Sequence, residues 1–479
     1  MSTRNTKPSI LAYPAMLWIT VCFALLGSYQ FGYHLGILNT SLYWVTKDLG
    51  LDFTSQGAVI VSAVVVGAVV GSLFAGQAAD ALGPKKALLI NNAWLLVGTV
   101  LCAAAPGGYW GLLAGRALAG VGAGAASLYV PRYISEVAPI SIRGALATLN
   151  QAFICVGILV AYLVGLPYQH NEPQTVAVAS HLVSWWRVMF LFGIVPAVLQ
   201  AVGLLFTPES PVWLNWKNRR ATALYNEHRL LGSLWREEGE VDSTTNLEEP
   251  LQEQEAAEED SGLEGGWGAL LKRRYRRIMI LAAALPILQQ ASGINTVVFY
   301  SSDVFAKAGL DSPVLGSIIV GSVNVAGTLL AATLMDRAGR RQLLLTSQIV
   351  MAVCLFALAV STYLPLSKVA EGVVSLIVVM GFVLGFSIGS GPIPWVYLPE
   401  VLPNEIKGPA AALCTSLNWL SNLIVGLTFP AMLALLHVGG AYLVYAVLNV
   451  LGAVFVAALM VETKQRSLAQ IQAQLLHLD

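Results

Sequence analysis

The chain has 479 residues, of which 56% are hydrophobic and only 11% are charged, and its mean hydropathy is +0.68. Soluble domains carry roughly 25% charged residues, so this composition excludes a soluble globular protein and indicates a polytopic membrane protein. The formal net charge of zero points to no charged partner, and we expect no nucleic acid among its partners.

Twelve apolar segments are long enough to cross a bilayer as helices. We place them at residues 14–38, 57–80, 87–105, 109–131, 147–168, 186–207, 277–306, 313–335, 342–363, 372–399, 408–430 and 439–461. The sequence therefore predicts an all-α membrane protein with twelve transmembrane helices in two six-helix bundles. The bundles should cover residues 1–207 and 277–463, with a linker at 208–276 and a tail at 464–479.

Lys and Arg fix the predicted orientation, because cytosolic loops of membrane proteins carry an excess of them. Both termini are placed in the cytosol, since this puts most of the basic loop residues inside: Lys85, Lys86, Arg132, Arg143, 272–277, Arg337, Arg340, Arg341, Lys407, Lys464 and Arg466. The outer loops then hold little more than Lys47, Arg187, Lys307 and Lys368.

The linker has two parts of different composition. Residues 213–231 show helical spacing with basic residues, whereas Glu237–Glu264 holds twelve acidic residues and no Lys or Arg. Such a block cannot bury enough apolar surface to offset its ordering entropy, so we expect a disordered cytosolic tether. A regulatory docking role is the alternative.

The two halves repeat each other. Glu136-Val-Ala-Pro-Ile-Ser-Ile-Arg143-Gly matches Glu400-Val-Leu-Pro-Asn-Glu-Ile-Lys407-Gly, and both follow the fourth span of their half. A second repeat, at Asp80–Lys86 and Asp336–Arg341, follows the second span of each half. Paired bundles with a ligand site between them are typical of secondary transporters.

These repeated motifs pair carboxylates with basic residues at the inner mouth of the bundle. They either anchor helix ends at the membrane surface or form an inner gate whose salt bridges link the halves in one state and break in the other. The duplicated spacing favours the gate, whose candidate residues are Glu136, Arg143, Asp336, Arg340, Glu400 and Lys407.

Amides lie at membrane depth, where hydrocarbon offers no partners. Each alone is more often a bond between helices than a ligand contact. As a set they form a neutral group of donors and acceptors, which suits a neutral polyhydroxy solute such as a sugar. The residues are Gln151, Gln289, Gln290, Asn295, Asn324, Asn418 and Asn422.

Two sequences should break helices inside the membrane. One is Ser292-Gly293, directly after the paired glutamines, and the other is Gly389-Ser-Gly-Pro-Ile-Pro-Trp395. Interruptions at corresponding positions point to a binding site, and Trp395 can stack on a sugar face. The alternative is a packing kink with an interfacial Trp.

In their order and spacing, these motifs resemble the sugar porters of the major facilitator superfamily, of the facilitative glucose transporter type. The resemblance runs from about Gly27 to Leu468. It also rests on Gln30-Phe-Gly-Tyr33, Gly115-Arg116, Pro208-Glu-Ser-Pro211 and Glu462-Thr-Lys464. The runs Phe31–Gly36, Lys47–Gly50 and Ile154–Leu159 are most similar to plastidic glucose translocators.

The resemblance implies that a hexose, D-glucose first, is bound by Gln151, Gln289, Gln290, Asn295, Asn324 and Trp395, with Asn418 nearby. It implies an outer gate at Phe299 and Tyr300, where the family has two tyrosines. Ser387 stands where mammalian glucose carriers have a glutamate. Ala81, Pro84 and Val212 stand where the family usually has arginines, which predicts a weaker inner gate in the N-terminal half.

Proton-coupled relatives carry an aspartate where this chain has His34, near Arg116. A histidine can titrate near neutral pH, but a second positive charge beside Arg116 is disfavoured. We therefore expect uniport by alternating access, with proton symport through His34 and Arg116 as the alternative.

A sugar sensor that does not transport is a further alternative. We find no enzyme constellation, cofactor motif or metal cluster, and the five cysteines suggest no disulfide framework. We expect a functional monomer, in the plasma membrane or a plastid envelope.

Overall fold

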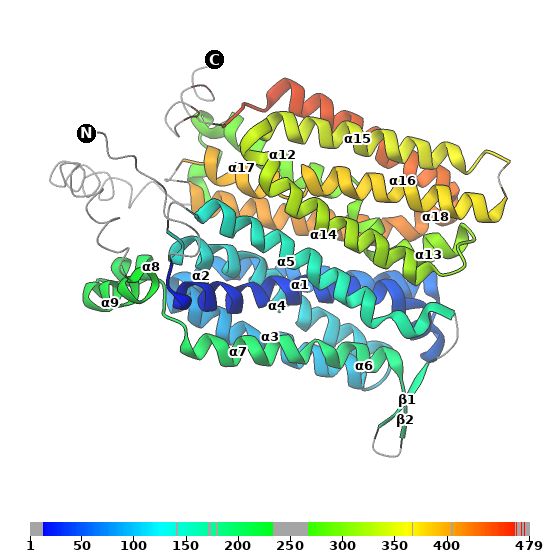
Figure 1. The fold of residues 1–479 in the computed structure, drawn as a ribbon, viewed down its shortest axis with the longest axis horizontal. Helices are drawn as coiled ribbons and strands as arrows, with labels where there is room; N and C mark the ends of the chain where they lie inside the picture. Colours follow the sequence, from blue (N-terminus) through cyan, green and yellow to red (C-terminus); the bar gives the residue numbers. More distant parts are fainter. Residues whose placement is uncertain are drawn as a thin grey trace.

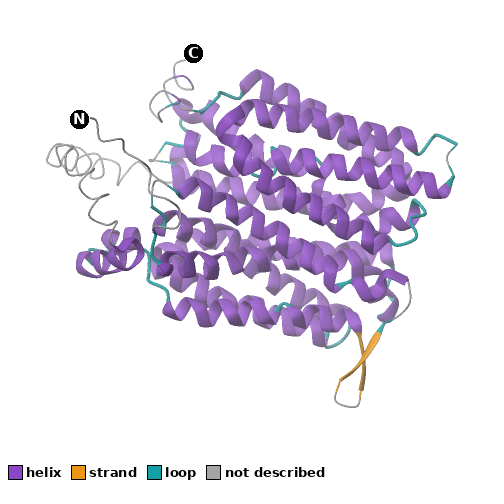
Figure 2. Cartoon of the chain, in the orientation of Figure 1, coloured by secondary structure: helices purple, strands orange, loops and turns teal. Residues whose placement is uncertain are grey.

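The structure is a computed structural model. It describes residues 13–139, 142–170, 174–178, 181–232, 267–365, 367–403 and 406–464, together with 466, 471 and 474. Long helices run roughly side by side through the molecule and make up nearly all of the described chain (Figures 1 and 2).

The N-terminal half consists of seven helices that make six crossings. They are α1 (Ala15–Asp48), α2 (Ala58–Leu82), α3 (Pro84–Ala104), α4 (Tyr109–Val137), α5 (Arg143–Val164), α6 (Trp185–Phe192) and α7 (Ile194–Phe206). The short π-helix η2 (Phe53–Gly57) leads into α2, and the 3-10 helix η3 (Leu166–His170) follows α5. The sixth crossing bends at Gly193, between α6 and α7.

The C-terminal half also makes six crossings. Its helices are α12 (Arg276–Ala291), α13 (Ile294–Lys307), α14 (Pro313–Ala338), α15 (Arg340–Ser361), α16 (Lys368–Ile388), α17 (Ile393–Val401) and α18 (Lys407–Leu459). Helices α12 and α13 form one broken crossing, and α16 and α17 form another. Helix α18 is interrupted by non-helical backbone at His437 and contains the last two crossings.

The predicted twelve-helix arrangement is confirmed. Ten helical stretches are long and apolar enough to cross a membrane, and α18 counts once among them although it holds two crossings. Helix α5, whose apolar part is Thr148–Val164, supplies the remaining one. Both predicted breaks are present, because Gly293 has a φ of 90° between α12 and α13, and residues 389–392 separate α16 from α17.

The two ends of the bundle carry different small elements. Strands β1 (Thr175–Val178) and β2 (His181–Ser184) form an antiparallel hairpin that the sequence did not predict, and we call this end the hairpin side. Helices α8 (Pro211–Trp216) and α9 (Arg220–Leu231) lie at the opposite end, the linker side. The 3-10 helices η5 (Trp267–Leu271) and η6 (Arg273–Tyr275) precede α12. The acidic segment Glu237–Glu264 lies outside the described residues.

Some boundaries differ from those predicted. Helix α1 continues ten residues past the predicted end at residue 38, because Leu42, Trp44 and Val45 are buried in the core and extend its apolar packing. The eleventh crossing continues past residue 430 to the kink at His437.

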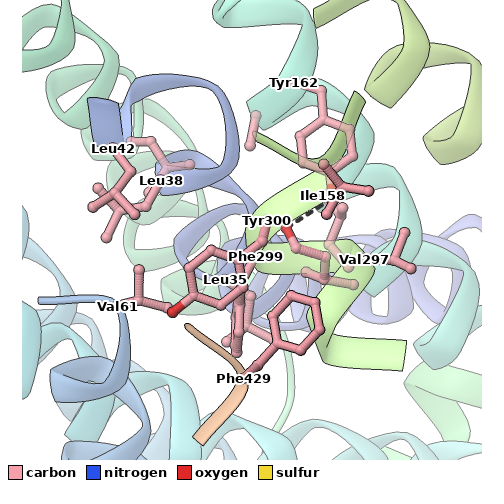
Figure 3. Packing of buried hydrophobic residues seen from close by; sticks show 14 of the residues in the cluster. Leu35, Leu38, Leu42, Val61, Ile158, Tyr162, Val297, Phe299, Tyr300 and Phe429 are labelled. Carbon is pink, nitrogen blue, oxygen red and sulfur yellow. Dashed lines mark hydrogen bonds between the residues drawn. The ribbon is translucent and has the colours of Figure 1, made fainter. Parts of the chain in front are cut away.

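Apolar side chains from both halves pack together toward the hairpin side. Figure 3 shows Leu38 of α1 and Val61 of α2 around the same cluster as Phe299 of α13 and Phe429 of α18. Other large apolar side chains point outward, among them Phe74 and Phe206, as expected for a surface that faces lipid.

Candidate functional site

Four of the predicted site amides form one hydrogen-bonded chain at the broken seventh crossing. Gln290 Nε2 donates to Asn418 Oδ1 (3.1 Å), Asn418 Nδ2 donates to Gln289 Oε1 (2.8 Å), and Asn295 donates to Gln290. All four side chains are buried. The chain joins α12, α13 and α18, so the structure brings these four predicted site residues together.

Gln289 also reaches the other break. Its Nε2 donates to the backbone oxygens of Ser390 (2.9 Å) and Gly391 (2.7 Å), which lie between α16 and α17. A broken helix leaves backbone acceptors without intrahelical partners, and the Gln289 amide satisfies two of them. The two interrupted crossings are thereby linked directly.

Of the three remaining predicted amides, Gln151 and Asn324 belong to a second chain, whereas the buried Oδ1 of Asn422 has no hydrogen-bond partner among the described residues. Gln151 Nε2 donates to Cys155 Sγ (3.7 Å), Cys155 Sγ donates to Asn324 Oδ1 (3.4 Å), and Ser387 Oγ donates to the same oxygen (2.7 Å). This chain crosses from α5 in the N-terminal half to α14 and α16 in the C-terminal half. Asn324 thus keeps a hydroxyl partner at position 387.

Two tryptophans flank the amides on the C-terminal side. Trp395 is half-buried in α17, near the break that Gln289 caps. Trp419, one residue after Asn418, is buried against the ring of Phe31 (5.1 Å between centroids), and its Nε1 donates to Ser127 Oγ (3.4 Å). Trp419 was not among the predicted site residues, although its place beside Asn418 was a usable signal.

On the hairpin side, hydrogen bonds join the two halves. Asn39 Nδ2 of α1 donates to the backbone oxygens of Val297 (3.1 Å) and Val298 (2.9 Å) in α13, and Ser302 Oγ donates to Asn39 Oδ1 (2.7 Å). Tyr162 of α5 donates to the same Val298 oxygen (3.0 Å). Asn39 was not among the predicted residues, although it is a polar residue inside an apolar helix.

The predicted outer-gate residues lie in this closed region. Phe299 and Tyr300 are both buried, and their rings meet edge to face. Tyr300 donates to the Gly426 backbone oxygen (3.1 Å) and its ring lies beside Phe429 (5.6 Å between centroids; Figure 3).

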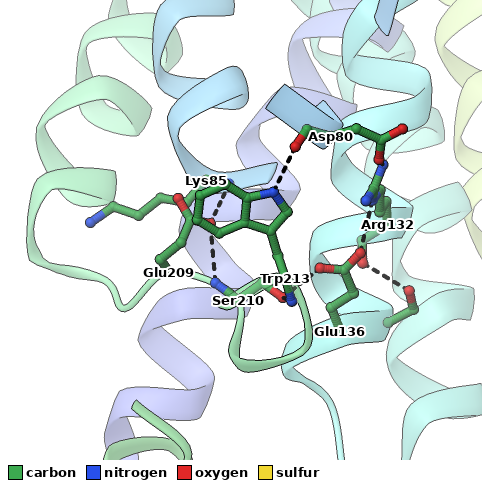
Figure 4. Close-up of polar contacts among 8 residues, drawn as sticks. Asp80, Lys85, Arg132, Glu136, Glu209, Ser210 and Trp213 are labelled. Carbon is green, nitrogen blue, oxygen red and sulfur yellow. Dashed lines mark hydrogen bonds and ion pairs between the residues drawn. The ribbon is translucent and has the colours of Figure 1, made fainter. Parts of the chain in front are cut away.

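On the linker side of the N-terminal half, Arg132 of α4 joins two carboxylates (Figure 4). It pairs with Glu136 (2.8 Å) and with Asp80 (2.6 Å). Ser210 also donates to Glu136. Glu209, next to Ser210, accepts from the backbone N–H groups of Lys85 (2.9 Å), Lys86 (3.3 Å) and Ser210 (3.1 Å).

The C-terminal half repeats this arrangement on its own linker side. We call each of the two clusters of contacts a corner: the N-terminal corner is built around Glu136 and Glu209, and the C-terminal corner around Glu400 and Glu462. Glu462 accepts from the backbone N–H groups of Arg340 (2.9 Å), Arg341 (3.1 Å), Thr463 (3.0 Å) and Lys464 (3.0 Å). Thr463 Oγ1 donates to Glu400 Oε2 (2.6 Å), as Ser210 does to Glu136. The guanidinium of Arg340 pairs with Glu400 (3.1 Å).

The two equivalent carboxylates differ in acidity. Burial raises the pKa of Glu209 above its ordinary value, and the backbone donors only partly offset this. Burial acts the same way on Glu462, but its four backbone donors outweigh it and lower the pKa.

The gate between halves stays a prediction. The pairs of Arg132 and of Arg340 each lie within one half. The side chains of Arg143 and Asp336 lie outside the described part of the chain, and Lys407 is exposed at the start of α18.

His34 and Arg116 lie close together and are both fully buried. Arg116 donates to the His34 backbone oxygen (2.7 Å), whereas the imidazole Nε2 lies 3.3 Å from Thr99 Oγ1. The guanidinium therefore contacts the backbone of His34, and the ring bonds to a different helix.

Comparison with known proteins decides the family. A family model described as "Sugar (and other) transporter" matches residues 19–475. The chain belongs to this sugar transporter family. The family is one of carriers, not of enzymes.

Two relatives of this sugar transporter are glucose carriers by name. It is 38% identical to plastidic glucose transporter 4 of Arabidopsis thaliana over 453 residues, which cover 94% of this chain and 79% of the relative. It is 32% identical to the glucose transporter GlcP of Staphylococcus epidermidis over 452 residues, 94% and 95% of the two chains.

The fold of this sugar transporter is that of the major facilitator superfamily. The proton:xylose symporter XylE bound to 6-bromo-6-deoxy-D-glucose superposes with a TM-score of 0.76 at 27% identity, over 96% of this chain and 99% of XylE. A partially occluded inward-open XylE from E. coli gives a TM-score of 0.75 at 26% identity, over 95% and 100% of the chains.

Proposed function

We propose that this transporter carries a hexose, D-glucose first, by facilitated diffusion with alternating access. The observation that carries the proposal is the pair of neutral amide chains beside the two broken helices. Amides both donate and accept, so they can exchange their mutual bonds for those of sugar hydroxyls. Two relatives named as glucose transporters support the choice of sugar.

The site residues follow from these chains. Gln289, Gln290, Asn295 and Asn418 form the C-terminal wall, Gln151 and Asn324 form the seam with the N-terminal half, and Trp395 offers a ring for stacking. Of these, Gln289 is also a structural residue, because it caps the break at Ser390 and Gly391. Asn295 donates to Gln290 alone among the described residues, so it is the amide most easily released to a sugar.

We assign the state of the carrier from its two sides. The Asn39 bonds to α13 hold the halves together on the hairpin side, whereas the pairs of Arg132 and of Arg340 on the linker side stay within their halves. This is the pattern of a carrier closed on the hairpin side, and we place the linker side in the cytosol with both termini. Tyr300 and Phe299 then form the closed outer gate.

The proposed membrane is the plastid envelope, and the proposed unit is a monomer. The similarity to plastidic relatives supports the envelope. The twelve crossings of one chain form a complete pair of bundles, which supports a monomer.

Uniport is proposed over proton symport. The Asp and Glu residues of the described spans lie near helix ends, and Arg116 contacts the backbone of His34. A proton-coupled carrier needs a group that titrates in contact with the pathway, and the buried imidazole bonded to Thr99 offers a poor one.

Purified protein in liposomes tests the proposal. We expect saturable uptake of labelled D-glucose that stops at equal concentrations inside and outside. An imposed proton gradient should not change this end point. Accumulation above equilibrium that a protonophore abolishes and that His34→Asn lacks would establish symport instead, and absence of saturable uptake would refute transport.

Asn295→Ala tests the site. It removes one hydrogen-bond partner from a buried hydroxyl, which costs about 1–3 kcal/mol and raises the KM for glucose roughly ten- to a hundredfold. Asn91→Ala is the matched control, because in the described part of the chain the Asn91 amide donates to the Gly122 backbone oxygen, which joins α3 to α4 away from the amide chains. An unchanged KM in folded Asn295→Ala would make this amide a bond between helices only.

A further inference from the structure

Cys155 stands between the predicted sugar ligands of the two halves. Its Sγ accepts from Gln151 Nε2 at 3.7 Å within α5 and donates across the seam to Asn324 Oδ1 in α14 at 3.4 Å. Gln151 is the one amide that the proposed site takes from the N-terminal half, and Asn324 is its nearest C-terminal partner in this chain of bonds. The thiol therefore links the Gln151 amide of the N-terminal half to the Asn324 amide of the C-terminal half.

A thiol can make both of the hydrogen bonds that this position requires. A thiol has one proton and soft lone pairs, so it can donate once and accept weakly. Thr328 Oγ1 lies 3.5 Å from the sulfur, but its own proton goes to the Asn324 backbone oxygen (2.8 Å), so Thr328 competes only as an acceptor. Among the described residues, Asn324 and Thr328 are thus the acceptors for the Cys155 proton.

The surroundings hold the sulfur in place. Cys155 is 1% exposed, and α5 packs closely on α14, where a Cβ built on Gly321 would lie 3.2 Å from Leu159 Cδ1. Asn324 Oδ1 is fixed from the other side by Ser387. A buried thiol with these contacts sets the position of two amides at once.

We propose that Cys155 is a positioning residue for the sugar site, which orients Gln151 and Asn324 across the seam between the halves. The inference rests on the proposed function, since it assigns a role at the same site. It predicts that the loss of the sulfur weakens sugar binding and leaves the folded carrier and its turnover largely intact.

Three variants separate polarity from volume. Cys155→Val fills the space without a donor, Cys155→Ala empties it, and Cys155→Ser keeps a hydroxyl. The serine oxygen lies closer to its own backbone and competes for the carbonyl one turn earlier, so it restores the bonds only in part. We expect the KM for D-glucose to rise about three- to tenfold in the Val and Ala variants and less in the Ser variant, with kcat within about twofold.

Two further readouts exclude a general structural effect. In an Asn324→Ala background, Cys155→Val should raise the KM by less than it does in the wild-type background, because one of its two partner amides is gone. Deoxyglucose analogues should show that Cys155→Val weakens selection for the same hydroxyl that Asn324→Ala weakens. Cys354→Ala, which removes a half-buried thiol from α15, is the control for loss of a cysteine.

The outcomes are distinct. Wild-type KM and analogue selection in Cys155→Val overturn the inference while glucose transport stands. Additive effects of the Cys155 and Asn324 substitutions overturn it as well. Wild-type protein without saturable glucose uptake overturns the proposed function itself. If Cys155→Ala fails to fold, the Val and Ser variants decide the result.

Discussion

The two linker-side corners have the same arrangement of contacts but are built from different residues. In each half, a carboxylate at the end of the last crossing caps the start of the third helix: Glu209 caps α3 and Glu462 caps α15. The N-cap residues, Gly83 and Gly339, have no side chain to do this. The cap is supplied from a distant part of the chain, which locks the third and sixth helices of each half together.

The difference between the corners originates at two prolines of the N-terminal half, Pro84 and Pro211. Pro84 begins α3 where Arg340 begins α15. Proline has no N–H, so the helix-start donors to Glu209 are Lys85 and Lys86, whereas those to Glu462 are Arg340 and Arg341. On the carboxylate's own side, Glu462 also receives the N–H groups of Thr463 and Lys464, whereas Glu209 receives that of Ser210 and is followed by Pro211. Glu209 therefore has three backbone donors and Glu462 has four. The missing guanidinium is replaced by Arg132, which pairs with Glu136 from within α4.

The corners therefore differ in whether the folded state favours the charged form of the capping carboxylate. The pKa of Glu209 is raised by burial, so the folded state disfavours its charge, whereas the pKa of Glu462 is lowered by its donors. A duplicated motif can thus have the same geometry in both halves and the opposite response to acid.

The largest expected effect comes from Gly83→Ala and Gly339→Ala. Both glycines have a positive φ, 92° and 87°, with extended ψ, a conformation nearly restricted to glycine. A Cβ would lie 2.8 Å from Glu209 Oε2 at Gly83 and 2.5 Å from Glu462 Oε2 at Gly339. Strain and the displaced carboxylate together should cost on the order of 3 kcal/mol.

Thermal unfolding in detergent measures this cost, and we expect Gly339→Ala to be the more destabilised. Gly76→Ala is the control, because Gly76 lies inside α2 with open space around its Cβ position and should tolerate alanine. Equal stability of both corner variants and the control would show that the carboxylate caps contribute nothing.

The next effect separates the two carboxylates. Glu462→Gln removes a charge that the folded state favours, which should cost about 1 kcal/mol at neutral pH because solvent screens this partly exposed carboxylate. Glu209→Gln removes a charge that the folded state disfavours, so its effect should stay below about 1 kcal/mol. Melting temperatures of both variants against wild type give the comparison.

The two variants should also respond to acid with opposite signs. A lowered pKa gives stability that is present above the unfolded value, 4.5, and is lost below it, so the advantage of wild type over Glu462→Gln should vanish in acid. A raised pKa acts in reverse: wild type should gain on Glu209→Gln as the pH falls toward 4.5. Parallel pH profiles would contradict the assigned difference.

The sequence predicted the fold and the set of amides, because both depend on patterns that are local in the chain. Apolar length identified the crossings, and the glycines and prolines marked the two breaks. The duplicated motifs indicated that the two halves repeat each other, and in the structure Glu209 and Glu462 cap corresponding helices.

Other features depend on contacts between distant helices, which no local pattern reveals. The role of Arg132 requires Asp80 and Glu136 to meet around it. The bond of Asn39 to α13 joins residues more than half the chain apart. The position of Cys155 between Gln151 and Asn324 depends on the seam of α5 with α14, which the sequence of either helix alone does not specify.

The smallest expected effect is also the most specific test of the comparison. Pro84→Ala gives α3 the backbone N–H that Arg340 gives α15, without placing a large side chain in a buried position. One extra bond should add about 1 kcal/mol, and the loss of proline's rigidity in the unfolded chain should remove a similar amount. The net stability at neutral pH should therefore hardly change, whereas the pKa of Glu209 should fall toward that of Glu462. The checking measurement is the stability of Pro84→Ala with and without Glu209→Gln between about pH 4 and pH 7. The acid response of Pro84→Ala should move toward that of the C-terminal corner. In the other half, Arg340→Pro compared with Arg340→Ala should change the pKa of Glu462 in the opposite direction, that is, raise it. If the substitutions leave both responses unchanged, the proline at position 84 does not distinguish the corners.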